Sequence, residues 1–149
     1  MAIEAVHQGD RGPRVATLHK GLLYLIRHQF GMEEQTRRAM EAQLKDEVAT
    51  KSFGAMTAHV VGIFQYQIRN RQDLPADVKK RFAGVPLSRK DDGTGNGDVD
   101  DLTAEALNWL VRETRALRAS KASLERYWDS RRVRIALAAI TLAPQKGVA

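Results

Sequence analysis

Residues 52–65, SFGAMTAHVVGIFQ, decide the fold. They begin with a turn at Phe53 and Gly54 and continue as a helix whose apolar residues recur at spacings of three and four. These apolar residues are Val60, Val61, Phe64 and Ile68. Thr57 lies near the start of the helix, where we expect its hydroxyl to accept a hydrogen bond from a free backbone N–H. The pattern predicts a helix over about 55–69 with one buried face.

A second stretch, residues 97–110, repeats this plan in the letters GDVDDLTAEALNWL. It has a turn at Gly97, a threonine at position 103 and then an apolar stripe that runs to Leu117. The stripe predicts a helix over about 103–117. Two copies of one turn and helix indicate a small helical module.

The segments before this repeat also have helical patterns. Pro13 suits the first position of a helix, because its missing N–H has no partner to lose there. The apolar residues that follow are Val15, Leu18, Leu22, Leu23, Leu25 and Ile26. They predict a buried helix that ends near Phe30, after a short lead-in over residues 1–11. Residues 33–48 have a narrow apolar stripe among many charges, which predicts a surface helix lying over the core.

The remaining segments are less regular. Residues 75–82, PADVKKRF, predict a short helix that starts at a proline, and residues 88–101 are polar and glycine-rich enough to predict an exposed loop. Residues 120–130 have a helical pattern. Residues 133–142 fit either a helix or an alternating strand, and their alanines favour the helix.

Composition and charge narrow the class of protein. The 149 residues include 43% apolar and 28% charged residues and no cysteine, which is typical of a soluble globular domain without disulfides or thiolate metal sites. Through Val111 the basic and acidic residues balance at 15 each, whereas residues 112–149 hold 9 basic and 3 acidic residues. The net charge of +6 therefore belongs to the tail. No apolar run approaches the roughly 20 residues of a membrane span.

These patterns predict an all-α fold with two parts. The first is a small helical module over residues 1–117, with the surface helix reaching over about 33–51 and a loop at about 84–101. The second is a basic amphipathic extension over residues 118–149. The amino terminus lacks the basic-then-apolar layout of a secretory signal, so we expect a cytoplasmic protein or one exported by another route.

Three blocks of the chain resemble the peptidoglycan-binding-like domain family, in the family's order. The first, in residues 8–25, matches at Gly9, Gly12, Val15, Leu18 and Leu22; the second matches at Phe53, Gly54, Thr57, Val61, Phe64 and Gln65; the third is residues 97–110. The resemblance implies a small orthogonal helical bundle of the peptidoglycan-binding-domain type, with an inserted helix at about 33–51. It also implies which residues define the turns: Gly9, Gly12, Phe53, Gly54, Thr57, Gly97 and Thr103. It also implies a ligand groove near these turns, with Gln65, Tyr66 and Asp98 as its candidates.

The chain departs from the family pattern at the inserted helix, at His19, which stands where the family usually has glutamine, and at the long connection before residue 97. Enlarged versions of this kind resemble domains joined to toxin-like or injection-machine proteins. Two functions stay open: a noncatalytic module that binds peptidoglycan or another cell-wall polymer, and a structural adaptor that binds a protein in a larger assembly.

The basic tail bears on the second function. Its candidate docking residues are Tyr127, Trp128, Arg131, Arg132 and Arg134. The arginines are mixed with acidic residues and lack the interleaved aromatics of a single-strand binder, so we do not expect nucleic acid as a partner. The tail predicts either a cap on the core or a partner anchor.

Catalytic and metal sites have weak signals. Residues 92–103 place oxygen-bearing side chains like a calcium loop, but the twelfth position holds Thr103 instead of the bidentate glutamate. The four histidines are scattered, without the paired spacing of a zinc helix. We therefore predict no catalytic residues, no metal and no cofactor.

Overall fold

The computed structural model describes residues 2–71, 73–82 and 95–129, apart from the side chains of Phe82 and residues 126–129. Within these residues the chain is all-α. The helices are α1 (Pro13–His28), α2 (Glu34–Thr50), α3 (Ala55–Arg69), α4 (Ala76–Phe82) and α5 (Asp101–Asp129). The helices predicted over about 55–69 and 75–82 are confirmed almost to the residue. The surface helix predicted over residues 33–48 is present as α2, which buries Met40 and Leu44 and exposes most of its other side chains.

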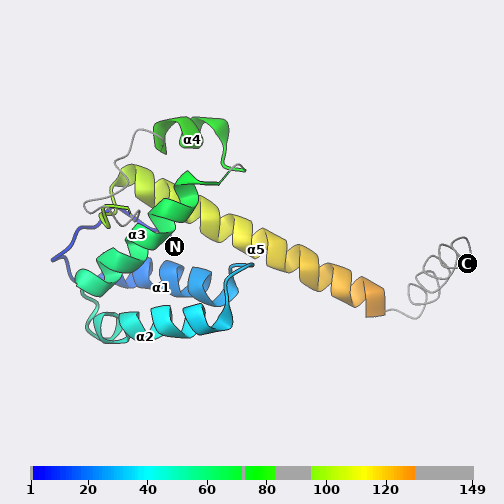
Figure 1. Ribbon diagram of the computed structural model, residues 1–149, viewed down its shortest axis with the longest axis horizontal. Coiled ribbons are helices and arrows are strands. Elements are labelled where there is room, and N and C mark those ends of the chain that lie inside the picture. The colour runs from blue at the N-terminus through cyan, green and yellow to red at the C-terminus, as the bar shows by residue number, and fades with distance from the viewer. Residues whose placement is uncertain (1, 72, 83–94, 130–149) are drawn as a thin grey trace, which may run out of the picture. The chain divides into compact units, whose positions relative to one another are not determined.

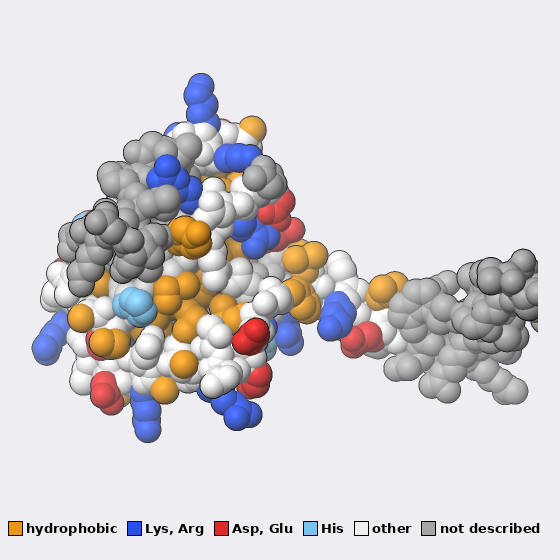
Figure 2. All heavy atoms as spheres, in the orientation of Figure 1, with side chains coloured by type: hydrophobic (Ala, Val, Ile, Leu, Met, Phe, Trp, Pro, Cys, Tyr) orange, Lys and Arg blue, Asp and Glu red, His pale blue; other side chains and the backbone are white. Residues whose placement is uncertain are grey.

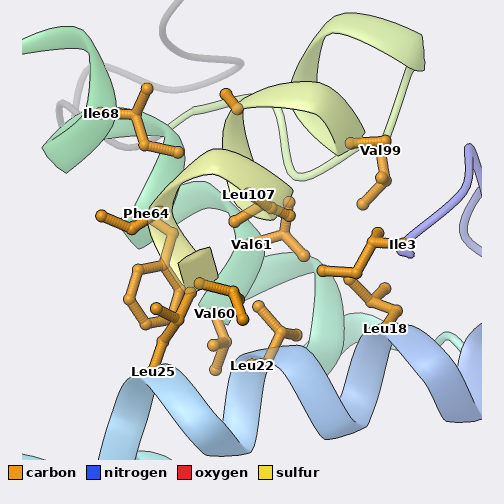
Figure 3. Packing of buried hydrophobic residues seen from close by; sticks show 14 of the residues in the cluster. Ile3, Leu18, Leu22, Leu25, Val60, Val61, Phe64, Ile68, Val99 and Leu107 are labelled. Carbon is orange, nitrogen blue, oxygen red and sulfur yellow. The ribbon is translucent and has the colours of Figure 1, made fainter. Parts of the chain in front are cut away.

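Helices α1 and α2 lie side by side, and α3 crosses and contacts both of them (Figure 1). Pro13 is the first residue of α1, a position that suits proline because the N–H it lacks would have no acceptor within the helix. The three helices meet through the apolar stripes that the sequence predicts. Figure 3 shows side chains of α1, α3 and α5 pointing toward one another in this core, among them Leu22, Phe64 and Leu107, all fully buried.

The lead-in belongs to the core, which the sequence did not predict. Ile3 and Val6 are buried, and Val6 forms an antiparallel bridge with Val99, with N–O distances of 3.0 and 3.2 Å. Asn108 of α5 also exchanges two hydrogen bonds with the backbone of Ile3. The amino terminus is therefore fixed against the start of α5 by residues roughly a hundred positions later in the chain.

The first two predicted turns pair with each other. The N–H of Gly9 donates to the carbonyl of Phe53 at 2.8 Å, the N–H of Phe53 donates to Asp10, and the N–H of Gly12 donates to Lys51. Arg11 and Ser52 form an isolated bridge between the same two segments. This pairing joins the entry of α1 to the connection between α2 and α3. It gives the turn residues a structural role.

The turn before α5 is fixed by the side chain of Gln65. This amide is 1% exposed, and its Nε2 lies within 3.1 Å of Asn96 Oδ1, the carbonyl of Asp98 and Thr103 Oγ1. Its Oε1 accepts the N–H of Gly97 at 2.9 Å. Gly97 has φ +77°, and a Cβ there would lie 2.6 Å from the carbonyl oxygen of Ala58, so only glycine fits.

The prediction of an exposed loop over residues 88–101 is therefore wrong for its last part. Gly97 and Val99 are buried, because the amide of Gln65 and the bridge to Val6 supply the partners that this polar segment lacks within itself. The N–H of Thr103 receives a local cap from Asp100 Oδ1 at 2.7 Å.

Helix α5 is longer than predicted. Two helices were expected, over about 103–117 and 120–130, but one helix runs from Asp101 to Asp129. Residues 117–121 contain neither glycine nor proline, so nothing ends the helix there. The chain divides into two compact units, residues 1–114 and 115–149. No helix among the described residues has the length and hydropathy needed to cross a bilayer.

Several predictions lie outside the described residues. They concern the side chains of Tyr127 and Trp128, the docking candidates Arg131, Arg132 and Arg134, the segment 133–142 and the first positions of the calcium-like loop, at residues 92–94.

Replacing Gln65 by alanine should destabilise the protein by about 2–4 kcal/mol, because it leaves buried donors and acceptors without partners and opens a cavity. Chemical denaturation measures this free energy of unfolding. Gln35→Ala is the matched control, because Gln35 is exposed on α2; we expect it to change stability by less than about 0.5 kcal/mol. Equal effects of the two substitutions would contradict the role of Gln65.

Candidate functional site

The amino terminus of α3 is capped by a carboxylate from another helix. Glu47 of α2 accepts hydrogen bonds from the N–H groups of Gly54 (2.8 Å), Met56 (3.0 Å) and Thr57 (2.8 Å). A carboxylate is favourable at this position because the first N–H groups of a helix are unpaired and carry partial positive charge. The expectation that the Thr57 hydroxyl caps the helix is wrong, since that hydroxyl instead donates to Glu47 Oε1 at 2.6 Å.

The hydrogen bonds at this position favour the ionised form of Glu47. Burial alone raises the pKa of Glu47, but the hydrogen bonds from Thr57, Met56 and Gly54 outweigh burial, so that the pKa is lowered overall. A Cβ at Gly54 would lie 2.7 Å from the carboxylate. Glycine at this position is therefore explained by the close approach of Glu47, and the turn depends on α2.

His19 of α1 completes this arrangement. Its Nε2 lies 2.9 Å from Thr57 Oγ1, and the residue is 1% exposed. Because the single hydroxyl proton of Thr57 goes to Glu47, the imidazole must donate its Nε2–H to the hydroxyl oxygen. Nδ1 is then a bare acceptor, and it is buried with no hydrogen-bond partner among the described residues. Burial lowers the pKa of His19, against a weaker opposite effect of the Glu47 charge.

The two junctions share one design. Thr57 and Thr103 are both buried, each at the third position of its helix, and each hydroxyl is hydrogen-bonded by a side chain from an earlier helix of the core. Gln65 of α3 binds Thr103, and His19 of α1 binds Thr57. The polar residues of the repeated turns therefore hold helices together.

The side chain of Asp98 lies apart from these junctions, although its backbone carbonyl bonds Gln65. Its Oδ1 is 2.7 Å from Nδ1 of His7, and the backbone N–H of His7 donates to Asp10. The hydrogen bond to Asp98 and the charge of that carboxylate raise the pKa of His7. This pair is at the surface, where it joins the lead-in to the turn before α5.

A surface groove of about 560 Å³ lies where the connection between α1 and α2 meets the last turns of α3. Its volume is within the range of small-molecule sites. Two of its aromatic side chains are well exposed, Phe30 by 47% and Tyr66 by 46%. The lining residues are Gln29, Phe30, Gly31, Met32, Glu33, Thr36, Tyr66, Gln67, Asn70 and Arg71.

Arg37 of α2 fixes the wall that carries Phe30. Its guanidinium donates to the backbone carbonyls of Ile26, Gln29 and Met32, which follow one another around the end of α1. The carbonyls at the end of a helix have no intrahelical donors, so a cation suits this position. The connection between α1 and α2 is therefore held by a side chain of α2 itself.

The positive charge of Arg71, which lines the groove, is balanced by an ion pair with Asp73. The guanidinium of Arg71 donates to both carboxylate oxygens of Asp73, at 2.9 and 2.7 Å, and lies 5.6 Å from the centre of the Trp109 ring. These hydrogen bonds from Arg71 lower the pKa of Asp73. The side-chain oxygen of Gln29 is buried without a donor among the described residues.

The three predicted groove residues do not share one groove. Tyr66 lines the groove at the end of α3, Asp98 pairs with His7, and Gln65 is buried with its amide fully used. Phe30, Gln67 and Arg71 were missed. The only signal for them in the sequence was the position of Phe30 between two helical patterns. The groove itself could not be predicted, because it forms where two segments distant in the sequence meet.

Charged side chains of both signs are interspersed on the face shown in Figure 2, in line with the balanced charges through Val111. Across the described ranges, no three or more His, Asp or Glu side chains are grouped so as to hold a metal ion. Comparisons of the chain with family models, curated proteins and solved structures find no match.

Replacing Glu47 by alanine should destabilise the protein by about 2 kcal/mol, since it removes a helix cap and charged hydrogen bonds that are only partly screened by solvent. Glu34→Ala on the same helix is the control, because Glu34 pairs with Arg38 at an exposed surface and should contribute less than about 0.5 kcal/mol. Thermal unfolding compares the two. A smaller loss for Glu47 than for Glu34 would show that the cap is unimportant.

Proposed function

We propose that this protein is a noncatalytic binding module that holds a bacterial cell-wall polymer, such as peptidoglycan, in the groove between Phe30 and Tyr66. The observation that carries the proposal is the exposure of two aromatic side chains, 47% and 46%, beside carboxamides in a groove without strong net charge. Aromatic rings can pack on the C–H faces of sugar rings, and carboxamides can form hydrogen bonds with hydroxyl and acetamido groups.

The sequence resemblance to peptidoglycan-binding-like domains supports the same class of ligand. The groove adds a reason for placing the ligand at the end of α3, because the polar side chains of the repeated turns are occupied by one another. Arg37 and Arg71 are held by partners within the protein, so the groove walls need little ordering when a ligand binds. The basic residues after Val111 would add a nonspecific attraction to an anionic wall.

Replacing Tyr66 by alanine should weaken binding to purified sacculi by about tenfold or more, because a buried aromatic contact typically contributes more than 1.4 kcal/mol. Co-sedimentation measures the dissociation constant, at low salt and again at high salt, where attraction by the tail is screened. Phe30→Ala tests the opposite wall and should also weaken binding.

The matched control is Met56→Ala. Met56 is 43% exposed on the same helix as Tyr66 but does not line the groove. We expect it to leave binding unchanged. No binding of the unsubstituted protein at low salt, or equal losses for Met56 and Tyr66, would rule out the groove as a wall-binding site.

The second candidate function is a structural adaptor for a protein in a larger assembly. The observation that favours it is the exposure of Leu117 by 46% and Leu124 by 50%, seven residues apart on α5 and therefore on one side of that helix. All described side chains over residues 115–125 are exposed. Exposed leucines at this spacing are typical of a helix that packs against a partner.

A chain that ends at Leu117 should keep its unfolding midpoint and lose capture of an adaptor partner. In the full chain, Leu117→Asp with Leu124→Asp should lose the same cross-linked partner, measured by mass spectrometry in cells. Ala119→Asp with Ser123→Asp is the control, because it adds the same charge to another side of the helix. Unfolding of the shortened chain would instead identify the tail as part of the core.

A further inference from the structure

We propose that the junction of His19, Thr57 and Glu47 is an acid-sensitive clasp, which opens the contact of α3 with α1 and α2 when His19 takes up a proton. The clasp is defined by these three side chains. The junction of Gln65 with Thr103 is its counterpart between α3 and α5, and it has no titratable side chain at the equivalent position.

The hydrogen-bond pattern leaves no place for a second imidazole proton. Nε2 of His19 already donates to Thr57, whose own proton is committed to Glu47 at 2.6 Å. A proton on Nδ1 would be a buried donor without an acceptor among the described residues. An unpaired donor on a buried cation is strongly unfavourable, so protonation is coupled to opening.

The surroundings of the ring do not compensate for this charge. Within the described part of the chain, Glu47 on α2 is the ionisable group whose charge acts on His19, and burial outweighs its attraction. Helix α3 presents the neutral Thr57 hydroxyl, while Leu18 and Leu22 beside His19 on α1 are apolar and buried. The pKa of His19 is lowered in the closed state, so the closed state is most stable above pH 6.5, the ordinary histidine value, and loses stability as the pH falls below it.

Two other groups titrate in different ranges. Because the pKa of His7 is raised, its contribution to folding stability is complete below pH 6.5 and is lost as the pH rises above that value. The lowered pKa of Glu47 gives a contribution that is lost only as the pH falls below its ordinary value of 4.5. Between pH 6.5 and 4.5, the change in the clasp therefore comes from His19.

Opening of the clasp has a local readout. The backbone N–H groups of Gly54 and Thr57 donate to Glu47, so their exchange measures opening of the clasp. The backbone N–H of Gly97 donates to Gln65, so its exchange measures opening of the counterpart junction. Hydrogen exchange of these amides, corrected for intrinsic rates, measures each opening separately. We expect protection of Gly54 and Thr57 to fall by up to about tenfold per pH unit below pH 6.5, with Gly97 unchanged.

The test variant is His19→Gln, which keeps a donor for Thr57 and copies the chemistry of Gln65. It should remove the pH dependence at Gly54 and Thr57. His59→Gln, an exposed histidine on α3, is the control and should retain it. The proposal would be overturned if His19→Gln kept the pH dependence of amide protection, or if both variants lost it. It would also be overturned if protection at Gly97 fell in parallel in the unsubstituted protein.

Should His19→Gln fail to fold, the unsubstituted protein still decides the question. Nitrogen-15 spectra of the His19 ring should show a protonated Nε2 and a bare Nδ1 until protection at Thr57 is lost. A ring that takes up a second proton while the amides of Gly54 and Thr57 stay protected would overturn the proposal.

Discussion

The structure depends on the hydroxyl of Thr57, which stands between the carboxylate of Glu47 and the imidazole of His19. This one group joins three helices: α1 supplies the histidine, α2 the carboxylate and α3 the hydroxyl. The same carboxylate caps α3 and lies against Gly54, so the turn, the start of α3 and helix α2 depend on each other. Helix α2 is therefore a necessary part of this fold.

The hydrogen bonds among the buried polar side chains also limit where a ligand could bind. Polar side chains in a small core must bond one another, because an unpaired buried polar group costs free energy. Gln65, Thr57 and Thr103 are used in this way and cannot also hold a ligand. The proposed binding site therefore lies at the periphery, where the connection after α1 and the end of α3 bring Phe30 and Tyr66 to one groove.

The two junctions also show how a repeated design can acquire different behaviour. A glutamine amide can satisfy acceptors and a donor without ever changing its charge, as Gln65 does with Thr103 and Gly97. A histidine in the corresponding place bonds the threonine equally well but leaves one nitrogen bare, and that nitrogen can take up a proton. A single difference in residue type thus separates a passive joint from one that responds to acid.

The sequence by itself determined the helices, because apolar spacings of three and four, as at Val61, Phe64 and Ile68, fix which face of a helix is buried. It also determined the turns, since Gly12, Gly54 and Gly97 interrupt those patterns. Only the tertiary structure decided which residue caps α3, that Val6 pairs with Val99, that α5 continues past Leu117, and where a groove forms. These features depend on contacts between segments far apart in the chain, and local periodicity contains no information on which distant side chain will meet a given turn.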